Sequence, residues 1–352
     1  MTHESGCAHN TDVHQQMADM LFGYWISQAI RATSDLSIAD HLAYGGPTAA
    51  EVAKREGSAP DATYRPMRAG VAVGLMTVDG DGRFHTTPVL ETLRTDAPRS
   101  MRALVMAVTG ASHWLPWQQF VLAVRSGKSQ APATLGMDLF EYFEQNPAEA
   151  REFSAGMTSI TSFWAREVAQ AIDTTNMRVA VDVGGANGAL LRILQQANPK
   201  LHGVVFDRPY IAGDVAIQVA QADFADRTDV VGGDFFKSVP TADLYLLKFV
   251  LHDWDHPSCA KILSRCREAM TPGGRIAVIE MIVGDTANPG VAALMDLDML
   301  VANDGGSGAF AGGIRCATGR RWSAADRSHH DGFSAERHRG GRVAPVASSR
   351  LT

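Results

Sequence analysis

The sequence predicts an α/β protein in which a Rossmann-like domain follows a mainly helical N-terminal domain. Short apolar, β-branched runs alternate with helical patterns over residues 176–304, which is typical of a parallel sheet covered on both faces. A glycine-rich turn separates the first of these strands from its helix. The length of 352 residues also exceeds the usual size of one hydrophobic core, so two domains are expected.

The N-terminal domain, residues 13–100, is predicted to be a winged helix. Thr48 is a candidate N-cap, and Glu51 occupies the capping-box position. Two Asp-Gly pairs between short apolar runs indicate a β-hairpin over 76–86. The expected helices cover 13–30, 36–42, 48–53 and 62–75.

A winged helix that binds DNA carries a basic recognition helix. The candidates in the helix before the hairpin are Arg65 and Arg68, and Pro66 between them should kink that helix. The chain has 32 basic and 38 acidic residues, a net charge of −6. We therefore expect no nucleic-acid partner.

Residues 101–175 are predicted to form a helical linker. Aromatic side chains gather around Trp117. Between residues 153 and 164 apolar side chains recur mostly at spacings of three and four, and Met157 and Phe163 belong to this stripe. Such a stripe is most often part of a core.

The glycine turn at 184–188 is a candidate ligand site. Gly184 and Gly188 let backbone amides approach a ligand closely, and the following helix offers unpaired N–H groups at its N-terminus. The spacing differs from the dinucleotide fingerprint, and Ala186 stands where a second glycine would admit pyrophosphate.

Acidic side chains follow the expected strands. Asp182 lies just before the glycine turn, where an acid suits a ligand with positive charge and hydroxyl groups. Asp207 ends the second strand, 19 residues after Gly188, about where a carboxylate reaches ribose hydroxyls. Asp234 and Phe235 follow the third strand and could read the amine and the face of an adenine. A nucleoside with a cationic centre and no pyrophosphate describes S-adenosylmethionine.

Two further polar residues lie near the ends of later strands. His252 follows the fourth strand, at the carboxyl edge where open sheets bind ligands. Glu280 is expected within the fifth strand, where an unpaired buried carboxylate would be costly. The expected strands cover 179–183, 203–207, 229–231, 242–248 and 275–283, and the last two helices cover 258–270 and 291–300.

Four segments together resemble the small-molecule O-methyltransferases of the plant caffeate and bacterial antibiotic-tailoring type. They are Asp-Val-Gly-Gly-Ala-Asn-Gly (182–188), Phe-Asp-Arg-Pro (206–209), Gly-Asp-Phe-Phe (233–236) and Leu-Lys-Phe-Val-Leu-His-Asp-Trp (247–254). The resemblance covers residues 15–304 and implies methylation of a hydroxyl on a small phenolic or polyketide-like metabolite with S-adenosylmethionine. It also implies a homodimer formed through the N-terminal domain.

The resemblance assigns roles to particular residues. His252 would be the general base, and Glu280 would hold its imidazole in the right tautomer. By position, Asp253 and Asp255 are expected to serve capping and solvation. The residues expected at the cofactor are Asp182, Gly184, Gly188, Asp207, Arg208, Asp234, Phe235, Lys248 and Trp254. Those expected in the acceptor pocket are Trp117, Met157 and Phe163.

Position alone leaves structural alternatives open for these residues. His252 could instead cap the helix that follows Pro257. Glu280 could face solvent at the end of the sheet, and Lys248 could be a solvated strand-end lysine. Trp254 could pack against the adenine or only wall the pocket.

Composition indicates a cytoplasmic protein without a metal site. The four cysteines are scattered and form no C-x-x-C motif, so neither a disulfide framework nor a metal centre is expected. Apolar stretches such as 276–283 are too short to span a bilayer. The N-terminus has no basic segment followed by an apolar core, so we expect no signal peptide.

The resemblance ends at residue 304. Residues 305–352 contain eight arginines, no lysine and three acidic residues. We expect an atypical, disordered tail and interpret it as a shifted reading frame, since GC-rich DNA read out of frame yields this composition; the alternative is a genuine basic tail. Without its last strands the sheet would keep an open edge, and activity would be in doubt.

Other functions stay open on the sequence. A relative of these enzymes could bind the cofactor but hydroxylate or decarboxylate its substrate, although the retained His252 argues against this. A winged-helix regulator could sense the nucleoside. The altered tail could also leave the protein inactive.

Overall fold

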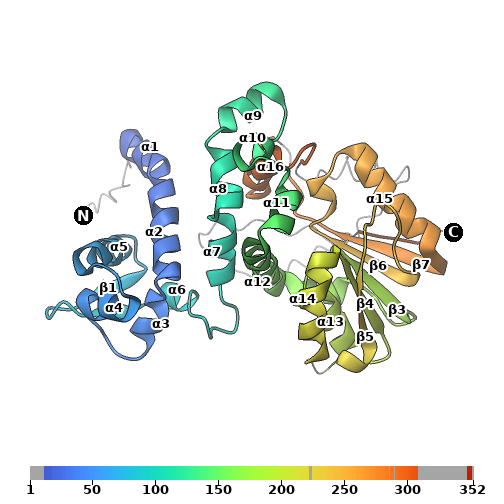
Figure 1. The fold of residues 1–352 in the computed structure, drawn as a ribbon, viewed down its shortest axis with the longest axis horizontal. Coiled ribbons are helices and arrows are strands. Elements are labelled where there is room, and N and C mark those ends of the chain that lie inside the picture. Colours follow the sequence, from blue (N-terminus) through green and yellow to red (C-terminus); the bar gives the residue numbers. More distant parts are fainter. Residues whose placement is uncertain (1–11, 222–223, 285, 289, 308–346, 351–352) are drawn as a thin grey trace, which may run out of the picture. The chain divides into compact units, whose positions relative to one another are not determined.

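The computed structural model describes residues 12–307, apart from 222–223, 285 and 289, together with residues 347–350. The chain divides into two units, residues 1–109 and 110–352 (Figure 1). The helices expected over 101–175 are divided between them, because the first of these helices belongs to the first unit.

The first unit consists of short helices and one hairpin. Its elements are α1 (Val13–Leu21), α2 (Gly23–Asp35), α3 (Ile38–Ala43), α4 (Ala49–Glu56), α5 (Pro60–Ala72), β1 (Met76–Val78), β2 (Phe84–Thr86), α6 (Pro88–Glu91) and α7 (Arg102–Val108). The single helix expected over 13–30 is two helices, which meet at Phe22. Pro66 lies inside α5, and the helix continues beyond it to Ala72.

Local signals in the first unit act as the sequence predicts. The Thr48 hydroxyl accepts from the N–H of Glu51, and the Glu51 carboxylate accepts from the N–H of Thr48 at 2.8 Å. Met76 pairs with Thr86 in the antiparallel hairpin. Side chains from α3, α4, α5 and the hairpin enclose a core around Met67, which is fully buried.

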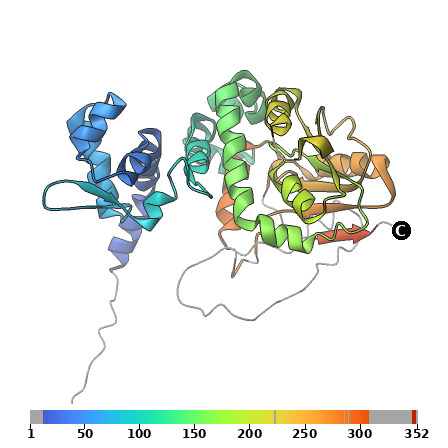
Figure 2. The same ribbon diagram turned by 90° about the horizontal axis from the view of Figure 1, so that it is seen from below.

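The second unit begins with helices and continues as alternating strands and helices. Its elements are α8 (Ala111–Trp117), α9 (Phe120–Ser126), α10 (Ala131–Leu135), α11 (Leu139–Gln145), α12 (Pro147–Ala171), β3 (Val179–Val183), α13 (Ala189–Ala197), β4 (His202–Asp207), α14 (Pro209–Ala220), η1 (Ala225–Arg227), β5 (Thr228–Gly232), β6 (Ala242–Lys248), η2 (Leu251–Asp253), α15 (His256–Ala269), β7 (Met270–Ile279), α16 (Ala292–Ala302) and β8 (Ala347–Arg350). Figure 2 shows the long α12 in green. Within the described ranges, no helix combines the length and apolarity needed to cross a bilayer.

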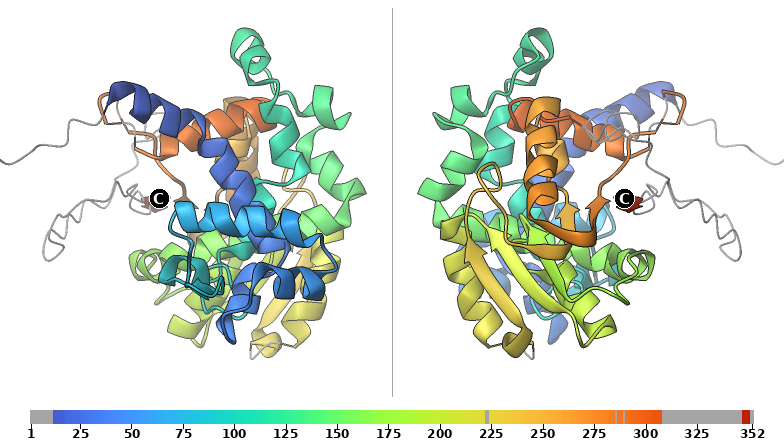
Figure 3. Two further views of the ribbon diagram at one scale, coloured as in Figure 1. Left: turned by 90° about the vertical axis from the view of Figure 1, so that its left-hand side faces the viewer. Right: turned by 90° about the vertical axis from the view of Figure 1, so that its right-hand side faces the viewer.

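A six-stranded sheet forms the centre of the second unit, in the order β5-β4-β3-β6-β7-β8. The strands from β3 to β7 are parallel, as predicted. From β3 the chain adds β4 and β5 on one side and then returns to add β6 and β7 on the other (Figure 3, right). Open α/β sheets bind ligands at the carboxyl ends of the strands where the order reverses, which here are β3 and β6.

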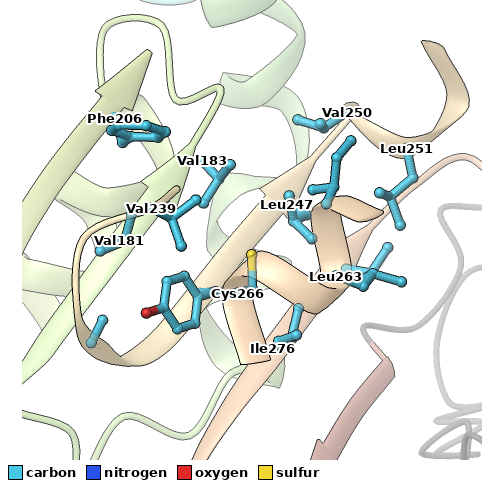
Figure 4. Close-up of a cluster of buried hydrophobic side chains, with 14 of the residues drawn as sticks. Val181, Val183, Phe206, Val239, Leu247, Val250, Leu251, Leu263, Cys266 and Ile276 are labelled. Carbon is cyan, nitrogen blue, oxygen red and sulfur yellow. The ribbon is translucent and has the colours of Figure 1, made fainter. Parts of the chain in front are cut away.

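Helices cover both faces of this sheet because successive strand residues are apolar on both sides. On one face Val181 and Leu247 pack with Leu263 and Cys266 of α15, as Figure 4 shows. On the other face Leu244 and Leu246 pack with side chains of α12, α13 and α14. Both faces of the sheet are therefore packed beneath its carboxyl edge.

The end of the chain corrects one expectation. Residues 347–350 form β8, which pairs antiparallel with Arg275 to Val278 of β7 (Figure 2, red). The edge of β7 that was expected to stay open is therefore paired over this stretch. The rest of the tail, 308–346 and 351–352, lies outside the described residues, so its disorder and its origin in a shifted frame stay predictions.

Candidate active site

Asp182 of β3 and Lys248 of β6 lie at the reversal point of the sheet. Asp182 is 3% exposed, and burial raises its pKa to about 7 although Lys248 opposes this. Burial lowers the pKa of Lys248 to about 8, against the attraction of Asp182 and Glu280. Neither charge is fully compensated by the protein, so the pair can accommodate a ligand that brings positive charge and hydroxyl donors.

The glycine turn has the backbone conformation that only glycine adopts easily. Gly184 has a φ of +66° and Gly188 a φ of +69°. The Asp207 carboxylate at the end of β4 accepts from the N–H of Ala186 at 2.8 Å and from that of Arg208 at 2.7 Å. Burial raises the pKa of Asp207. The hydrogen bond from Ala186 thus ties the glycine turn to Asp207, the acid predicted at the end of the second strand.

His252 and Glu280 come together, as the sequence predicts. Nδ1 of His252 lies 2.6 Å from Oε2 of Glu280, and Oε1 of Glu280 accepts from the N–H of Leu251 at 3.1 Å. Strand β7 ends at Ile279, so Glu280 follows the strand rather than lying within it as expected. Its side chain is 1% exposed, which excludes a solvent-facing carboxylate.

The helix that follows is capped by another residue. The Asp255 carboxylate accepts from the N–H of Ser258 at 2.8 Å, so Asp255 serves the expected capping role and His252 does not. The alternative in which His252 caps this helix is therefore excluded.

Two carboxylates set the protonation of His252. Burial by itself lowers the pKa of the imidazole, but Glu280 and then Asp253 outweigh it and raise the pKa to about 9. Lys248 opposes the rise. The two carboxylates therefore favour the protonated imidazole, with Nδ1 facing Glu280 and Nε2 facing Asp253.

The prediction that Asp253 serves capping and solvation is wrong. Its side chain is 17% exposed, and Oδ1 lies 3.4 Å from Nε2 of His252. Nδ2 of Asn303, directly after α16, donates to the same oxygen at 2.7 Å. Burial raises the pKa of Asp253 to about 6, so this acid belongs to the buried polar group around His252.

Aromatic rings form a wall beside this group. Trp254 stacks on Phe140 of α11, with ring centroids 5.6 Å apart. Phe235 and Phe236 meet the Trp254 ring edge-on at 5.9 and 4.7 Å. The Arg208 guanidinium lies over Phe140 at 5.5 Å. The predicted residues Phe235, Trp254 and Arg208 therefore share one aromatic surface.

Asp234 lies at the start of the turn that carries these rings. Oδ1 accepts from the N–H of Phe236 at 2.8 Å, and Oδ2 lies 3.4 Å from Nζ of Lys237. The carboxylate therefore shapes the turn in which Phe235 lies.

The residues predicted for the acceptor pocket lie on α8 and α12. Nε1 of Trp117 donates to Oδ1 of Asp298 on α16 at 2.7 Å. Asp298 in turn raises the pKa of Asp253, so α8 reaches the neighbourhood of His252. Met157 is partly buried on α12, and Phe163 on the same helix meets Trp164 edge-on. No described contact tests the pocket role of either residue.

Sequence reasoning missed Asp253, Asn303, Phe140 and Phe249 as neighbours of the site. Asp253 and Phe249 lie inside the quoted motif beside His252, so their position could have singled them out. Asn303 and Phe140 carry no such signal, because α16 and α11 bring them in from distant parts of the chain. Over the ranges that the structure describes, no three His, Cys, Asp or Glu side chains gather as a metal site.

Comparisons with known proteins agree with this geometry. The O-methyltransferase domain matches residues 117–310, and the O-methyltransferase dimerisation domain matches residues 18–96. The 3-amino-4-hydroxybenzoate 4-O-methyltransferase of Streptomyces cremeus is 33% identical over 294 residues, covering 83% of this chain and 80% of the relative. The O-demethylpuromycin-O-methyltransferase of Streptomyces alboniger is 36% identical over 299 residues, covering 83% and 79%.

A solved structure shows the same likeness in three dimensions. It is an O-methyltransferase from neocarzinostatin biosynthesis in complex with S-adenosylmethionine and 2-hydroxy-5-methyl naphthoic acid. It superposes with a TM-score of 0.74 and 30% sequence identity over 93% of this chain and 96% of its own. With a matching dimerisation domain, a matching catalytic domain and a buried histidine–carboxylate pair at the sheet edge, this chain belongs to the O-methyltransferase family.

Proposed function

We propose that this protein transfers a methyl group from S-adenosylmethionine to a hydroxyl group of a small aromatic metabolite, with His252 as general base. The observation that carries this proposal is the buried contact between His252 and Glu280 at the carboxyl edge of the sheet. Membership of the O-methyltransferase family supports the reaction class. The Streptomyces cremeus relative is named for methylation of a hydroxybenzoate, and the solved structure contains a naphthoic acid, which supports the acceptor class.

The residues at the reversal point fit S-adenosylmethionine. When bound, this cofactor supplies a methyl group on a positively charged sulfur. Asp182 is buried and Asp207 is partly buried, and burial raises the pKa of both carboxylates, so a cation or hydroxyl donors would stabilise their charged forms. A Cβ on Gly184 would lie 3.0 Å from a side-chain methyl of Val250, so the turn packs closely against Val250 at this position and favours glycine. The proposed cofactor contacts are Asp182, Gly184, Gly188, Asp207, Arg208, Asp234, Phe235, Lys248 and Trp254.

The His252–Glu280 pair can remove the acceptor proton. With Nδ1–H donated to Glu280, the neutral imidazole keeps its lone pair on Nε2, which takes the proton of the hydroxyl. Glu280 then stabilises the imidazolium that forms. Positive charge beside Lys248 disfavours the protonated imidazole, so a cationic ligand there lowers the pKa of His252 toward the working pH.

The acceptor pocket is assigned to Trp117, Met157 and Phe163. Trp117 supports this assignment because its hydrogen bond with Asp298 joins α8 to α16. Asn303 directly follows α16 and binds Asp253, the neighbour of His252. Positioning of an aromatic acceptor by such walls supplies much of the rate of a displacement reaction.

We also propose a homodimer formed through the first unit. Helices α1 and α2 expose several large apolar side chains, and such residues gathered on one surface are rare in monomeric proteins. These residues are Val13, Met17, Met20, Leu21, Tyr24, Trp25 and Ile26. The matched dimerisation domain includes most of them. A cytoplasmic location stays a prediction.

Calorimetry with S-adenosylhomocysteine, followed by mass spectrometry of a panel of phenols incubated with S-adenosylmethionine, tests the proposal. We expect binding and a product that gains one methyl group. Replacing His252 by Ala should lower the rate by roughly 10²- to 10⁴-fold and leave the affinity for S-adenosylhomocysteine nearly unchanged. His256→Ala, a change at an exposed histidine on α15, is the matched control and should keep the full rate.

Other outcomes would overturn the proposal. Absence of cofactor binding would exclude the methyltransferase, and a product that gains oxygen or loses carbon dioxide would favour the hydroxylating or decarboxylating relative. Salt-dependent binding to an operator sequence without any transfer would favour the regulator.

A further inference from the structure

Phe249, the first residue after β6, has an unusual backbone conformation. Its φ is +56°, in the left-handed region that bulky side chains rarely adopt. Its N–H donates to the carbonyl of Ile279 at 3.0 Å, which ties the strained residue to the end of β7. Residues held in this way cluster at functional sites, because the surrounding structure must maintain the strain.

This conformation brings the Phe249 ring to the side chains of Lys248 and His252. Along a regular strand successive side chains point to opposite faces, so Phe249 would point away from Lys248. With the left-handed backbone, Nζ of Lys248 lies 4.3 Å from the centroid of the Phe249 ring. The same ring lies 5.6 Å from the imidazole of His252, with the two planes inclined by 35°.

We propose that Phe249 is a positioning residue for proton transfer at His252: its ring holds the Lys248 ammonium and the His252 imidazole in place and stabilises the imidazolium that forms. This inference rests on the proposed function. In the step concerned, the proton moves from the acceptor hydroxyl to Nε2 of His252, and the oxygen keeps the electron pair. The imidazole thereby becomes a second cation beside Lys248.

An aromatic ring can relieve the repulsion between these cations. The face of the ring carries negative electrostatic potential, and it attracts an ammonium or imidazolium in the absence of water. A leucine of similar bulk would exclude water but would not attract the charge. The left-handed backbone at Phe249 is the cost of presenting one ring to both groups.

Other charged and titratable groups also face His252, and the test must separate them from Phe249. They are Lys248 at the end of β6, Asp253 in η2 and Glu280 after β7. Asp298 on α16 acts on Asp253, and Cys259 on α15 lies near Glu280 and Asp253. A substitution at position 249 removes none of these groups, and the aromatic replacements keep the ring beside Lys248.

The test is the titration of the His252 ring by NMR in the unliganded protein, together with the pH profile of kcat/KM. In Phe249→Leu we expect the pKa of His252 measured by NMR to fall by about half a unit or more. The rising limb of the kcat/KM profile should move to lower pH by the same amount. The plateau of kcat/KM should fall roughly 3- to 30-fold with KM little changed. Phe249→Trp should restore the wild-type titration, because it keeps an aromatic face.

Two further variants separate an electrostatic role from a packing role. Pentafluorophenylalanine at position 249 keeps the shape of the ring but reverses the sign of the electrostatic potential on its face. It should therefore lower the pKa of His252 without unfolding the protein. Phe224→Leu is the matched control, because Phe224 also lies under a cation, Arg192 at 5.4 Å, outside the site. It should leave the titration and the rate unchanged.

An unshifted His252 titration in both Phe249→Leu and the fluorinated variant would overturn the role of Phe249, whatever the change in rate. Failure of Phe249→Trp to restore the titration would also overturn it. Absence of methyl transfer in the wild-type protein would instead refute the proposed function, and the NMR titration distinguishes the two failures because it needs no turnover.

Discussion

Replacing Glu280 by Gln tests whether one carboxylate controls the proton on His252. In the structure both oxygens of Glu280 are used, one at 2.6 Å from Nδ1 of His252 and the other by the N–H of Leu251 at 3.1 Å. Gln has one acceptor oxygen and no charge, so it can satisfy only one of these donors. The substitution therefore removes the charge and keeps the shape.

The expected size of the effect follows from the protonation of His252. Burial lowers the pKa of the imidazole, and Glu280 with Asp253 raises it from 6.5 to about 9. That rise corresponds to roughly 3 kcal/mol of preference for the imidazolium. Without Glu280 only Asp253 opposes the effect of burial, so the pKa of His252 should fall back toward its ordinary value of 6.5.

The pH dependence of kcat/KM measures this change. Because only the neutral imidazole can take a proton, kcat/KM of the wild-type enzyme should rise about tenfold per pH unit and level off near pH 9. In Glu280→Gln the rising part of the kcat/KM profile should lie about 2 pH units lower than in the wild type. The plateau should fall on the order of 100-fold, since the base is weaker and its tautomer is no longer held.

A charge-matched control distinguishes this mechanism from a general electrostatic effect. Asp255→Asn removes the same charge nearby while keeping an N-cap residue for α15, so its pH profile should match the wild type. An unshifted limb in Glu280→Gln would refute the reasoning. An equal shift in Asp255→Asn would refute it as well.

Three further predictions concern stability and assembly. Because burial raises the pKa of Asp182 to about 7, its ionisation destabilises the fold increasingly from pH 4 to pH 7. In urea unfolding, Asp182→Asn should therefore be more stable than the wild type by up to a few kcal/mol at pH 8 and equally stable at pH 4. The variant should also bind S-adenosylmethionine more weakly. Equal stability at pH 8 would contradict this prediction. Asn303→Ala removes the 2.7 Å hydrogen bond to Asp253 and should cost about 1–3 kcal/mol in urea unfolding at pH 8, and no loss would show that the bond is dispensable. Trp25→Glu places a charge on the apolar surface of α1 and α2, where Trp25 is 54% exposed, and should give monomers by light scattering; an unchanged dimer would move the interface elsewhere.

Local patterns were sufficient for most of the fold. The capping box of Thr48, the hairpin after Met76 and the glycine turn at Gly184 each depend on residues a few positions apart, and all three form as predicted. The parallel sheet followed from the alternation of apolar strands and helices. Helix and strand ends were less predictable: Phe22 divides one expected helix, and β7 ends before Glu280, because tertiary packing decides where an element stops.

The polar group around His252 shows the limit of these patterns. The partners of His252 and Asp253 come from 28 and 50 residues away, at Glu280 and Asn303. Asp253 was assigned to capping because an acid near a helix start usually caps it, yet its neighbour Asp255 does so. Nothing in the spacing indicates that Asp253 is mostly shielded from solvent.

The order of the chain thus specifies which chemical groups stand at the carboxyl ends of the strands, since strand periodicity and glycine conformation are short-range properties. Whether His252 holds a proton is a property of the folded protein. It depends on how deeply the ring is buried and on which charges surround it, and only the packing of β6, β7 and α16 brings those charges within a few ångströms.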